Sequence, residues 1–224
     1  MSRQDNFVYL TFALVALLLS TALAQQFLAH SAQHLVQSTT VITLIVAVWG
    51  AGEDKLILRK AFIFPVATLA VAMLSYGLDV SGYDYFHLFL MLIFFIMSAK
   101  HTATQVLFTG AITGNKILGA ICLYLLMGLI FAIIYTLLHL SFNNAFNNMT
   151  NPTEWYSLFP DFIYFSFVTL TTLGFGDISP NMPLARFLVY LEAIVGQFYL
   201  AVLVASLVGQ RMSDITHNGK DNHE

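Results

Sequence analysis

Six long apolar segments constrain this chain more than any other feature of its sequence. A membrane-spanning helix needs about 20 mainly apolar residues. Six segments approach or exceed that length: Phe7–Leu28, Leu35–Gly52, Leu56–Leu78, Tyr83–Ala99, Ile117–Leu140 and Leu184–Val208. Only 9% of the 224 residues are charged, whereas soluble domains carry about 25%. The chain therefore has too few charged residues to cover a surface that faces water. The sequence therefore predicts an all-α membrane protein with six transmembrane helices.

A shorter apolar stretch, Phe159–Leu170, lies between the last two segments and is too short to span a bilayer. We expect a re-entrant helix here, which is tolerated at membrane depth only where protein surrounds it. Pro160 and Asp161 are expected to start this helix, because Pro fits a first turn and Asp complements the positive end of the helix dipole. The C-terminal end of the helix would then point toward the bilayer centre.

The first segment has a second interpretation, as a secretory signal peptide. Arg3 precedes the apolar run, and residues 22–24 (Ala-Leu-Ala) have the small-x-small form of a cleavage site. Residues 1–24 would then be removed. Against this, Asp5 neutralises the stretch before the apolar run, and the run continues beyond the cleavage site. We favour retention as a transmembrane helix, and both interpretations give the other helices the same topology.

The basic residues predict the orientation, because cytoplasmic loops carry an excess of Lys and Arg. With the N-terminus inside, eight of the nine fall on the cytoplasmic side: Arg3, Lys55, Arg59, Lys60, Lys100, Lys116, Arg211 and Lys220. Arg186 alone falls outside. We therefore predict a multi-pass protein of the cell membrane with cytoplasmic N- and C-termini. The segment Ser141–Phe159 and the loop before Leu184 would face the exterior.

The loop before the last segment contains the sequence Thr-Thr-Leu-Gly-Phe-Gly-Asp, from Thr171 to Asp177. Gly174 and Gly176 alternate with larger residues, and Gly accepts positive φ at no steric cost. Alternation of this kind lets successive carbonyls turn the same way. Four such strands around an axis would stack rings of carbonyl oxygens, which can replace the hydration shell of a small cation.

This stretch resembles the selectivity-filter signature of potassium channels, usually Thr-Val-Gly-Tyr-Gly-Asp. The resemblance covers about half the chain, Ile117 to Gly209, and implies passive K+ conduction by a homotetramer in the lipid bilayer, with the re-entrant helix and filter loop between the last two helices. One filter strand cannot surround an ion, so a tetrameric pore is expected. The implied filter residues are Thr172, Leu173, Gly174, Phe175 and Gly176, with K+ at the first four and Asp177 at the outer mouth.

Two further positions fit the resemblance. Arg186 follows Asp177 by nine residues, where the simplest two-helix potassium channels also have Arg. Gly196 follows Asp177 by nineteen, at the place of the hinge glycine in the family's inner helix. Gly196 also suits a close helix–helix contact, because small residues serve that purpose in membranes. We favour the hinge.

Three features depart from the family pattern. Leu173 and Phe175 replace Val and Tyr, and Phe175 has no hydroxyl to anchor the filter. Tyr164 and Phe165 stand where the family has a Trp-Trp pair. Val168 stands where some bacterial channels place a Glu. The supporting contacts are therefore expected to be more apolar, which leaves a weakly selective monovalent cation channel as an alternative function.

The chain divides into a four-helix membrane domain at 1–110, a pore domain at 111–211 and a cytoplasmic tail at 212–224. Voltage-gated relatives carry Arg or Lys at every third position of the fourth helix, because gating charge must move through the field. The fourth predicted helix, Tyr83–Ala99, contains neither residue. The first domain is expected to share the layout of a voltage sensor without its charges.

Glu192 is the one acid in the middle third of a predicted transmembrane helix. An ionisable residue at that depth is a functional candidate, so Glu192 is a candidate pH-sensitive modulatory group, and Arg186 is a second modulatory candidate. The favoured alternative for Glu192 is a hydrogen bond to Ser166 or Thr169 of the re-entrant helix, with the carboxyl either ionised or protonated.

The remaining chemistry-bearing residues indicate no cofactor, no catalytic site and no nucleic-acid partner. Cys122 lies in an apolar run, which is typical of a small buried hydrophobe. A metal site would need a third ligand beside His30 and His34. Three more histidines fall on separate helices and leave a membrane redox or enzyme subunit as a remote alternative: His87, His101 and His139.

Overall fold

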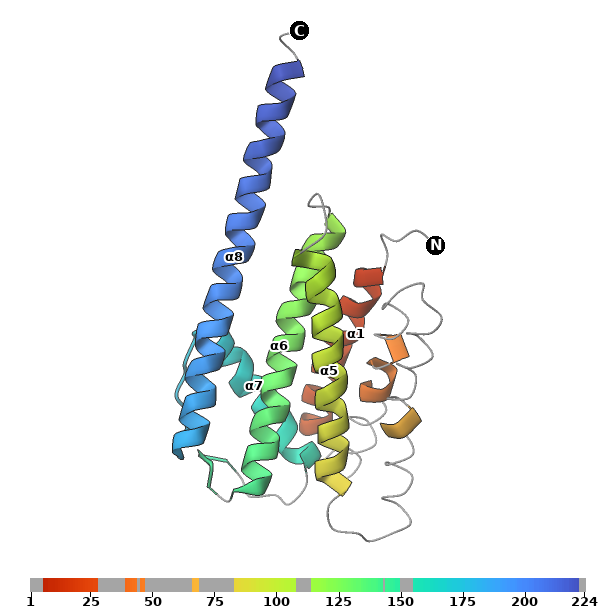
Figure 1. The fold of residues 1–224 in the computed structure, drawn as a ribbon. Helices are drawn as coiled ribbons and strands as arrows, with labels where there is room; N and C mark the ends of the chain where they lie inside the picture. Colours follow the sequence, from red (N-terminus) through yellow and green to blue (C-terminus); the bar gives the residue numbers. More distant parts are fainter. Residues whose placement is uncertain are drawn as a thin grey trace.

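The computed structural model describes residues 6–27, 39–43, 45–46, 66–68, 83–107, 114–142, 144–149 and 155–221 (Figure 1). Its long helices are α1 (Asn6–Phe27), α5 (Tyr83–Leu107), α6 (Gly114–Ser141), α7 (Trp155–Leu170) and α8 (Pro183–Asp221). Two short strands, β1 (Phe146–Asn147) and β2 (Ser179–Pro180), form an antiparallel pair. The described part of the chain is therefore mostly helical, as the sequence predicts.

Four of the described helices, α1, α5, α6 and α8, are long and apolar enough to cross a membrane. They correspond to the first, fourth, fifth and sixth predicted spans, which are confirmed as helices of spanning length and composition. The second and third predicted spans, Leu35–Gly52 and Leu56–Leu78, lie mostly outside the described residues. Helix α7 has 16 residues and is too short to span, as expected for a re-entrant helix.

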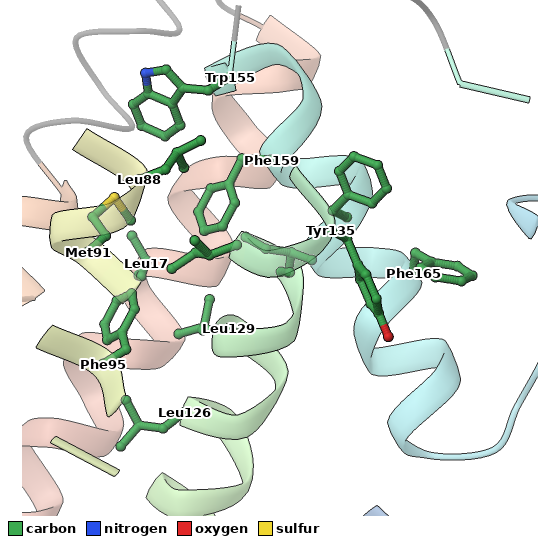
Figure 2. Packing of buried hydrophobic residues seen from close by; sticks show 14 of the residues in the cluster. Leu17, Leu88, Met91, Phe95, Leu126, Leu129, Tyr135, Trp155, Phe159 and Phe165 are labelled. Carbon is green, nitrogen blue, oxygen red and sulfur yellow. The ribbon is translucent and has the colours of Figure 1, made fainter. Parts of the chain in front are cut away.

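Helix α6 is the centre of the fold and packs against α1, α5, α7 and α8. It is apolar on every side, which is the pattern of a helix enclosed by other apolar surfaces. Figure 2 shows the resulting core, in which Leu129 of α6 lies among Leu17 of α1, Met91 of α5 and Phe159 of α7. This core holds α7 beside α6 and so fixes the position of the loop that follows α7.

Helix α5 is longer than the predicted fourth span. The sequence predicts its end at Ala99, before Lys100, but the helix continues to Leu107. Lys100 is exposed on this extension. A long basic side chain can lay its stem along an apolar surface and keep its head in water, so it does not end the helix. The predicted domain boundary at 110 lies in 108–113, outside the described residues.

Helix α7 begins at Trp155, earlier than the predicted start near Pro160. Trp155 is 1% exposed and lies against His87 of α5, with ring centroids 4.8 Å apart. Burial of this large ring offsets the free-energy cost of the backbone hydrogen bond that Pro160 cannot donate inside the helix. The prediction that Asp161 stands in the first turn is therefore wrong. Asp161 lies in the second turn and accepts a hydrogen bond from Gln25 Nε2 of α1 at 2.6 Å.

Helix α8 runs without interruption from Pro183 to Asp221, beyond the predicted end at Val208. Its 39 residues span about 58 Å at 1.5 Å per residue, well beyond a hydrocarbon core of about 30 Å. In Figure 1 its C-terminal half extends past the other helices. The predicted tail at 212–224 therefore begins as a continuation of this helix.

Candidate functional site

The loop from Thr171 to Asp177, here called the signature loop, alternates in backbone conformation. The φ angles of Thr172, Gly174 and Gly176 are 59°, 58° and 77°, and these are the only positive φ angles within this described stretch. Glycine reaches this region without strain, whereas a β-branched residue such as Thr172 does so rarely. The sign of φ thus repeats with a period of two, which is the alternation that turns successive carbonyls to one side.

The end of α7 holds the start of the signature loop. The Val168 carbonyl accepts hydrogen bonds from the backbone N–H groups of Leu173 at 2.9 Å and Gly174 at 3.3 Å. The Thr169 carbonyl accepts one from the Thr172 N–H at 2.9 Å. The C-terminal carbonyls of a helix form the negative end of its dipole. Helix α7 therefore directs partial negative charge at the base of the signature loop.

The signature loop is uncovered on one side in the single chain. Leu173 and Phe175 are 57% and 65% exposed. A Cβ added at Gly174 or Gly176 would meet no atom within 4 Å. Contiguous exposed apolar groups mark interaction surfaces more often than free ones. The side chains of Leu173 and Phe175 and the space beside the two glycines are therefore open in this structure.

Asp177, at the C-terminal end of the signature loop, is held by two neighbours. Its carboxylate accepts a hydrogen bond from the Tyr164 hydroxyl of α7, and this bond holds the pKa of Asp177 below its ordinary value. Its backbone carbonyl accepts a hydrogen bond from Asn148 Nδ2 at 2.8 Å. Tyr164 also stacks against Phe175, with ring centroids 6.5 Å apart and planes at 10°. The support of the loop is therefore more polar than the sequence predicts.

The β1–β2 pair brings Asn148 to this position. Phe146 lies opposite Pro180, and Asn147 lies opposite Ser179. Phe146 is 3% exposed and packs edge-on against α7 within the core, which anchors the strand. Asn148 follows directly and reaches the signature loop because β2 begins only two residues after Asp177.

Glu192 of α8 lies behind α7 with no exposed surface. Its Oε1 is 2.5 Å from the Ser166 hydroxyl, and its Oε2 accepts a hydrogen bond from the Tyr135 hydroxyl of α6 at 2.6 Å. The same Ser166 oxygen lies 2.7 Å from the Gly128 carbonyl of α6. The bond to Ser166 that the sequence suggests is present in the structure, and the role of Glu192 as a pH-sensitive group stays a prediction.

Gly196 lies one turn beyond Glu192, against the end of α7. A Cβ at Gly196 would lie 2.5 Å from the Leu170 carbonyl oxygen. Helix α8 shows no break at this residue, so the structure contains the close helix contact and the hinge stays a prediction. Arg186 is exposed near the start of α8, and its Nε donates to the Pro180 carbonyl at 3.4 Å.

Sequence reasoning did not single out Tyr135, the Tyr164 hydroxyl or Gln197. Gln197 Nε2 donates a hydrogen bond to Thr172 Oγ1 at 3.3 Å, which places an amide at the inner end of the signature loop. A polar side chain within an apolar span is the signal that identifies Gln197. Tyr135 carries no such signal, because tyrosine is common in apolar helices and α6 has no polar face.

The other candidate residues in the described part of the chain form no common site. The prediction that the three histidines lie on separate helices is wrong for two of them, because α5 extends to Leu107 and carries both His87 and His101. Cys122 is buried, and its sulfur lies 3.0 Å from Thr11 Oγ1 of α1. Among the described residues, no group of three or more His, Cys, Asp or Glu side chains could hold a metal ion. The pair His30 and His34 lies outside the described residues.

Comparison with known proteins gives one finding. Residues 119–212 match the family model described as Ion channel. This range covers a little under half of the chain and contains α7, the signature loop and most of α6 and α8. No curated protein and no solved structure matches the chain. The match supports an ion-channel family and function for a membrane-embedded, multi-pass protein, and that family is one of channels, not of enzymes.

Proposed function

We propose that this chain is the subunit of a potassium-selective channel, in which four copies conduct K+ passively through a carbonyl-lined filter. The observation that carries the proposal is the alternation of positive φ at Thr172, Gly174 and Gly176. A strand of this conformation presents carbonyl oxygens along one side, and rings of such oxygens replace the hydration shell of K+. The filter would be residues 172–176, with K+ held at the first four.

Helix α7 supports this proposal through its dipole. Its C-terminal carbonyls lie at the base of the signature loop, and partial negative charge there favours a cation where the bilayer gives least dielectric support. At the other end of the loop, Asp177 is exposed and has a lowered pKa, so it is ionised at neutral pH. Both ends of the proposed pathway therefore favour cations over anions.

The uncovered side of the signature loop supports fourfold assembly. One strand cannot enclose an ion, and a closed ring of identical copies supplies the missing sides. Helix α8 adds a row of exposed apolar side chains, which neighbouring copies or lipid would cover: Leu184, Phe187, Leu191, Ile194 and Phe198. The homotetramer would lie in the cell membrane, with both termini in the cytoplasm.

Flux from liposomes tests the proposal. The purified chain, reconstituted with internal potassium or sodium, should release potassium far faster than sodium. Gly174→Ala should abolish the flux, because alanine adopts φ of 58° only with strain. Gly114→Ala is the matched control, since Gly114 lies in open space without a positive φ. Undiminished potassium flux in Gly174→Ala would mean that the filter assignment is wrong.

A weakly selective cation channel is the second candidate, and one observation favours it. Phe175 stacks on Tyr164 of α7, and as a phenylalanine it has no hydroxyl with which to bond to that helix. A looser filter discriminates less between cations of different size. Reversal potentials with potassium on one side and sodium on the other separate the two candidates. A reversal near zero would establish the weakly selective channel and exclude the potassium-selective one.

A further inference from the structure

The buried carboxyl of Glu192 joins three helices at one point. It contacts the Ser166 hydroxyl of α7 at 2.5 Å and the Tyr135 hydroxyl of α6 at 2.6 Å. Ser166 in turn contacts the Gly128 carbonyl of α6 at 2.7 Å. The side chains of Glu192, Ser166 and Tyr135 each have no exposed surface. These residues and the Gly128 carbonyl are here called the Glu192 cluster.

The number of hydrogens available in the Glu192 cluster determines which groups donate its hydrogen bonds. Ser166 has one hydroxyl hydrogen but lies within bonding distance of two oxygens, Glu192 Oε1 and the Gly128 carbonyl. The carbonyl can only accept. If Ser166 donates to the Gly128 carbonyl, its contact with Glu192 needs a hydrogen from the carboxyl. Tyr135 then donates to the other carboxyl oxygen. This assignment satisfies every contact with one hydrogen each, and it requires a protonated Glu192.

The alternative, an ionised Glu192, leaves two oxygens in contact without a hydrogen between them. Ser166 would donate to the carboxylate, and its oxygen would face the Gly128 carbonyl at 2.7 Å with no donor. An ionised carboxylate is also costly to bury without a cation. The ionisable groups that face Glu192 in the described part of the chain are Tyr135 and Tyr124 of α6, and no Lys, Arg or His there forms an ion pair with it.

The Glu192 cluster lies in register with a second contact between the same two helices. Glu192 meets Ser166, and Gly196 meets the Leu170 carbonyl, so a spacing of four residues on α8 matches a spacing of four on α7. Residues four apart share a face of a helix. The two contacts therefore align α8 with the half of α7 that ends at the signature loop.

We propose that Glu192 is a positioning residue: it is protonated, donates its hydrogen to Ser166, and thereby couples the position of α8 to that of α7 and the filter base. This proposal rests on the proposed channel function. Glu192 does not touch the permeating ion and acts only through Ser166. A shift of α8 would pull on α7 through this bond, so the cluster transmits movement of the inner helix to the filter.

The choice of side chain at position 192 tests the proposal in full-length protein in liposomes. Glu192→Gln keeps a neutral donor and acceptor, so it should retain the potassium flux, the selectivity and the pH profile of the parent. Glu192→Ala leaves Tyr135 and Ser166 without this partner and should reduce flux about tenfold. Ser166→Ala should reduce it similarly, and the double variant Glu192→Ala/Ser166→Ala should be no worse than either alone.

Loss of flux in Glu192→Gln equal to that in Glu192→Ala would overturn the proposal, because a negative charge would then be what the site needs. Fully additive losses in the double variant would overturn the coupling through Ser166. Infrared spectroscopy gives a readout that does not depend on flux. The parent at neutral pH should show the carbonyl stretch of a protonated carboxyl, and Glu192→Gln should lack it.

The infrared result separates this proposal from the proposed function. If the parent carries no potassium flux but shows the protonated band, the channel assignment fails and the protonation of Glu192 stands. If the parent conducts potassium but lacks the band, the channel assignment stands, Glu192 is ionised, and the proposal for Glu192 fails. Thermal unfolding of each variant gives the fraction of folded protein, so that flux can be compared per folded protein. A flux per folded protein in Glu192→Ala equal to that of the parent would show that the positioning role is wrong.

Discussion

The two sides of α7 differ in how much of their surroundings one chain supplies. Behind the helix, Glu192, Ser166 and Tyr135 have no exposed surface and satisfy one another. In front of it, the signature loop is exposed from Thr171 to Asp177, and the space beside Gly174 is open. The rear contacts are complete within one chain, whereas in the proposed tetramer the front would acquire its environment only on assembly.

This difference separates two kinds of effect. A change behind α7 disturbs packing that exists in each subunit, so it should alter stability as well as conduction. If the proposed tetramer is right, a change in front leaves the single chain intact and should alter only conduction by the assembled copies. Stability and conduction measured side by side therefore show to which side of α7 a residue belongs.

Gly196→Ala should have the largest effect, because it adds a methyl group 2.5 Å from a backbone oxygen. The Leu170 carbonyl cannot turn aside as a flexible side chain could. Overpacking of this kind costs about 1–3 kcal/mol. We expect a lower thermal unfolding temperature in detergent together with a loss of potassium flux. Gly209→Ala, on the same helix but in open space, should change neither.

The same variant distinguishes the contact from the predicted hinge. A glycine that serves only as a hinge would tolerate alanine in the straight helix of the structure, because alanine favours helix. Gly196→Ala would then unfold at the parent temperature and fail only to open. An unchanged unfolding temperature therefore contradicts the packing role and favours the hinge.

The sequence predicts the helices well where their pattern is extreme. Four spans follow from apolar length alone, because a helix that meets lipid or other apolar helices needs no face-specific pattern. The start of α7 could not be predicted in this way. Pro160 and Asp161 are good signals for a helix start, but burial of Trp155 against His87 of α5 carries the helix back to residue 155. Tertiary packing overrode a local signal.

In the candidate site, too, some features could be predicted from local sequence and others depend on tertiary packing. The positive φ angles of Gly174 and Gly176 follow from their being glycines, because few other residues accept positive φ. The positive φ of Thr172 could not be predicted in this way. The bond between Glu192 and Ser166 follows from the scarcity of partners for an acid inside an apolar helix. Tyr135 and Asn148 could not be found, since their contacts depend on how α6 lies beside α8 and how the β1–β2 pair lies beside the signature loop.

Tyr164→Phe should have the next largest effect, confined to the front of α7. The hydroxyl of Tyr164 favours the ionised form of Asp177 and holds its pKa below the ordinary value. A carboxyl of lowered pKa keeps its hydrogen bond at neutral pH and loses it as pH falls through that pKa. Without the hydroxyl, the pKa of Asp177 should rise, and external acid should reduce potassium current at a higher pH than in the parent.

Recording current against external pH checks this prediction. Tyr190→Phe is the control, because Tyr190 is an exposed tyrosine of α8 whose ring packs edge-on against Phe187. The unfolding temperature should not change, since both Tyr164 and Asp177 are exposed in the single chain. Identical pH profiles for Tyr164→Phe and the parent would show that the bond does not persist in the assembled channel.

His87→Phe should raise stability slightly without changing conduction. His87 is 3% exposed, and neither ring nitrogen has a hydrogen-bond partner in the described part of the chain. Burial of an unsatisfied polar group is costly, so an apolar ring of similar size should stabilise the fold by about 1 kcal/mol. Thermal unfolding measures the gain. His101→Phe should give none, because the His101 ring pairs with Gln105 at 2.8 Å.

Gln197→Met should have the smallest effect. Gln197 lies where the front and the rear of α7 meet. The Gln197 amide occupies one acceptor position of Thr172 Oγ1, at 3.3 Å, and Thr172 is the first residue of the proposed filter. A long hydrogen bond of an exposed pair is worth about 0.5 kcal/mol. Its removal should shift K+ affinity at that site about twofold and leave the unfolding temperature unchanged.

Concentration dependence of potassium conductance from the cytoplasmic side measures that affinity. Gln26→Met, at an exposed position near the end of α1, is the matched control and should conduct as the parent does. A lower unfolding temperature in Gln197→Met would place Gln197 with the buried contacts behind α7. An unchanged affinity would mean that the assembled pore holds Thr172 by other contacts, so that the front of α7 depends on neighbouring copies even at its inner end.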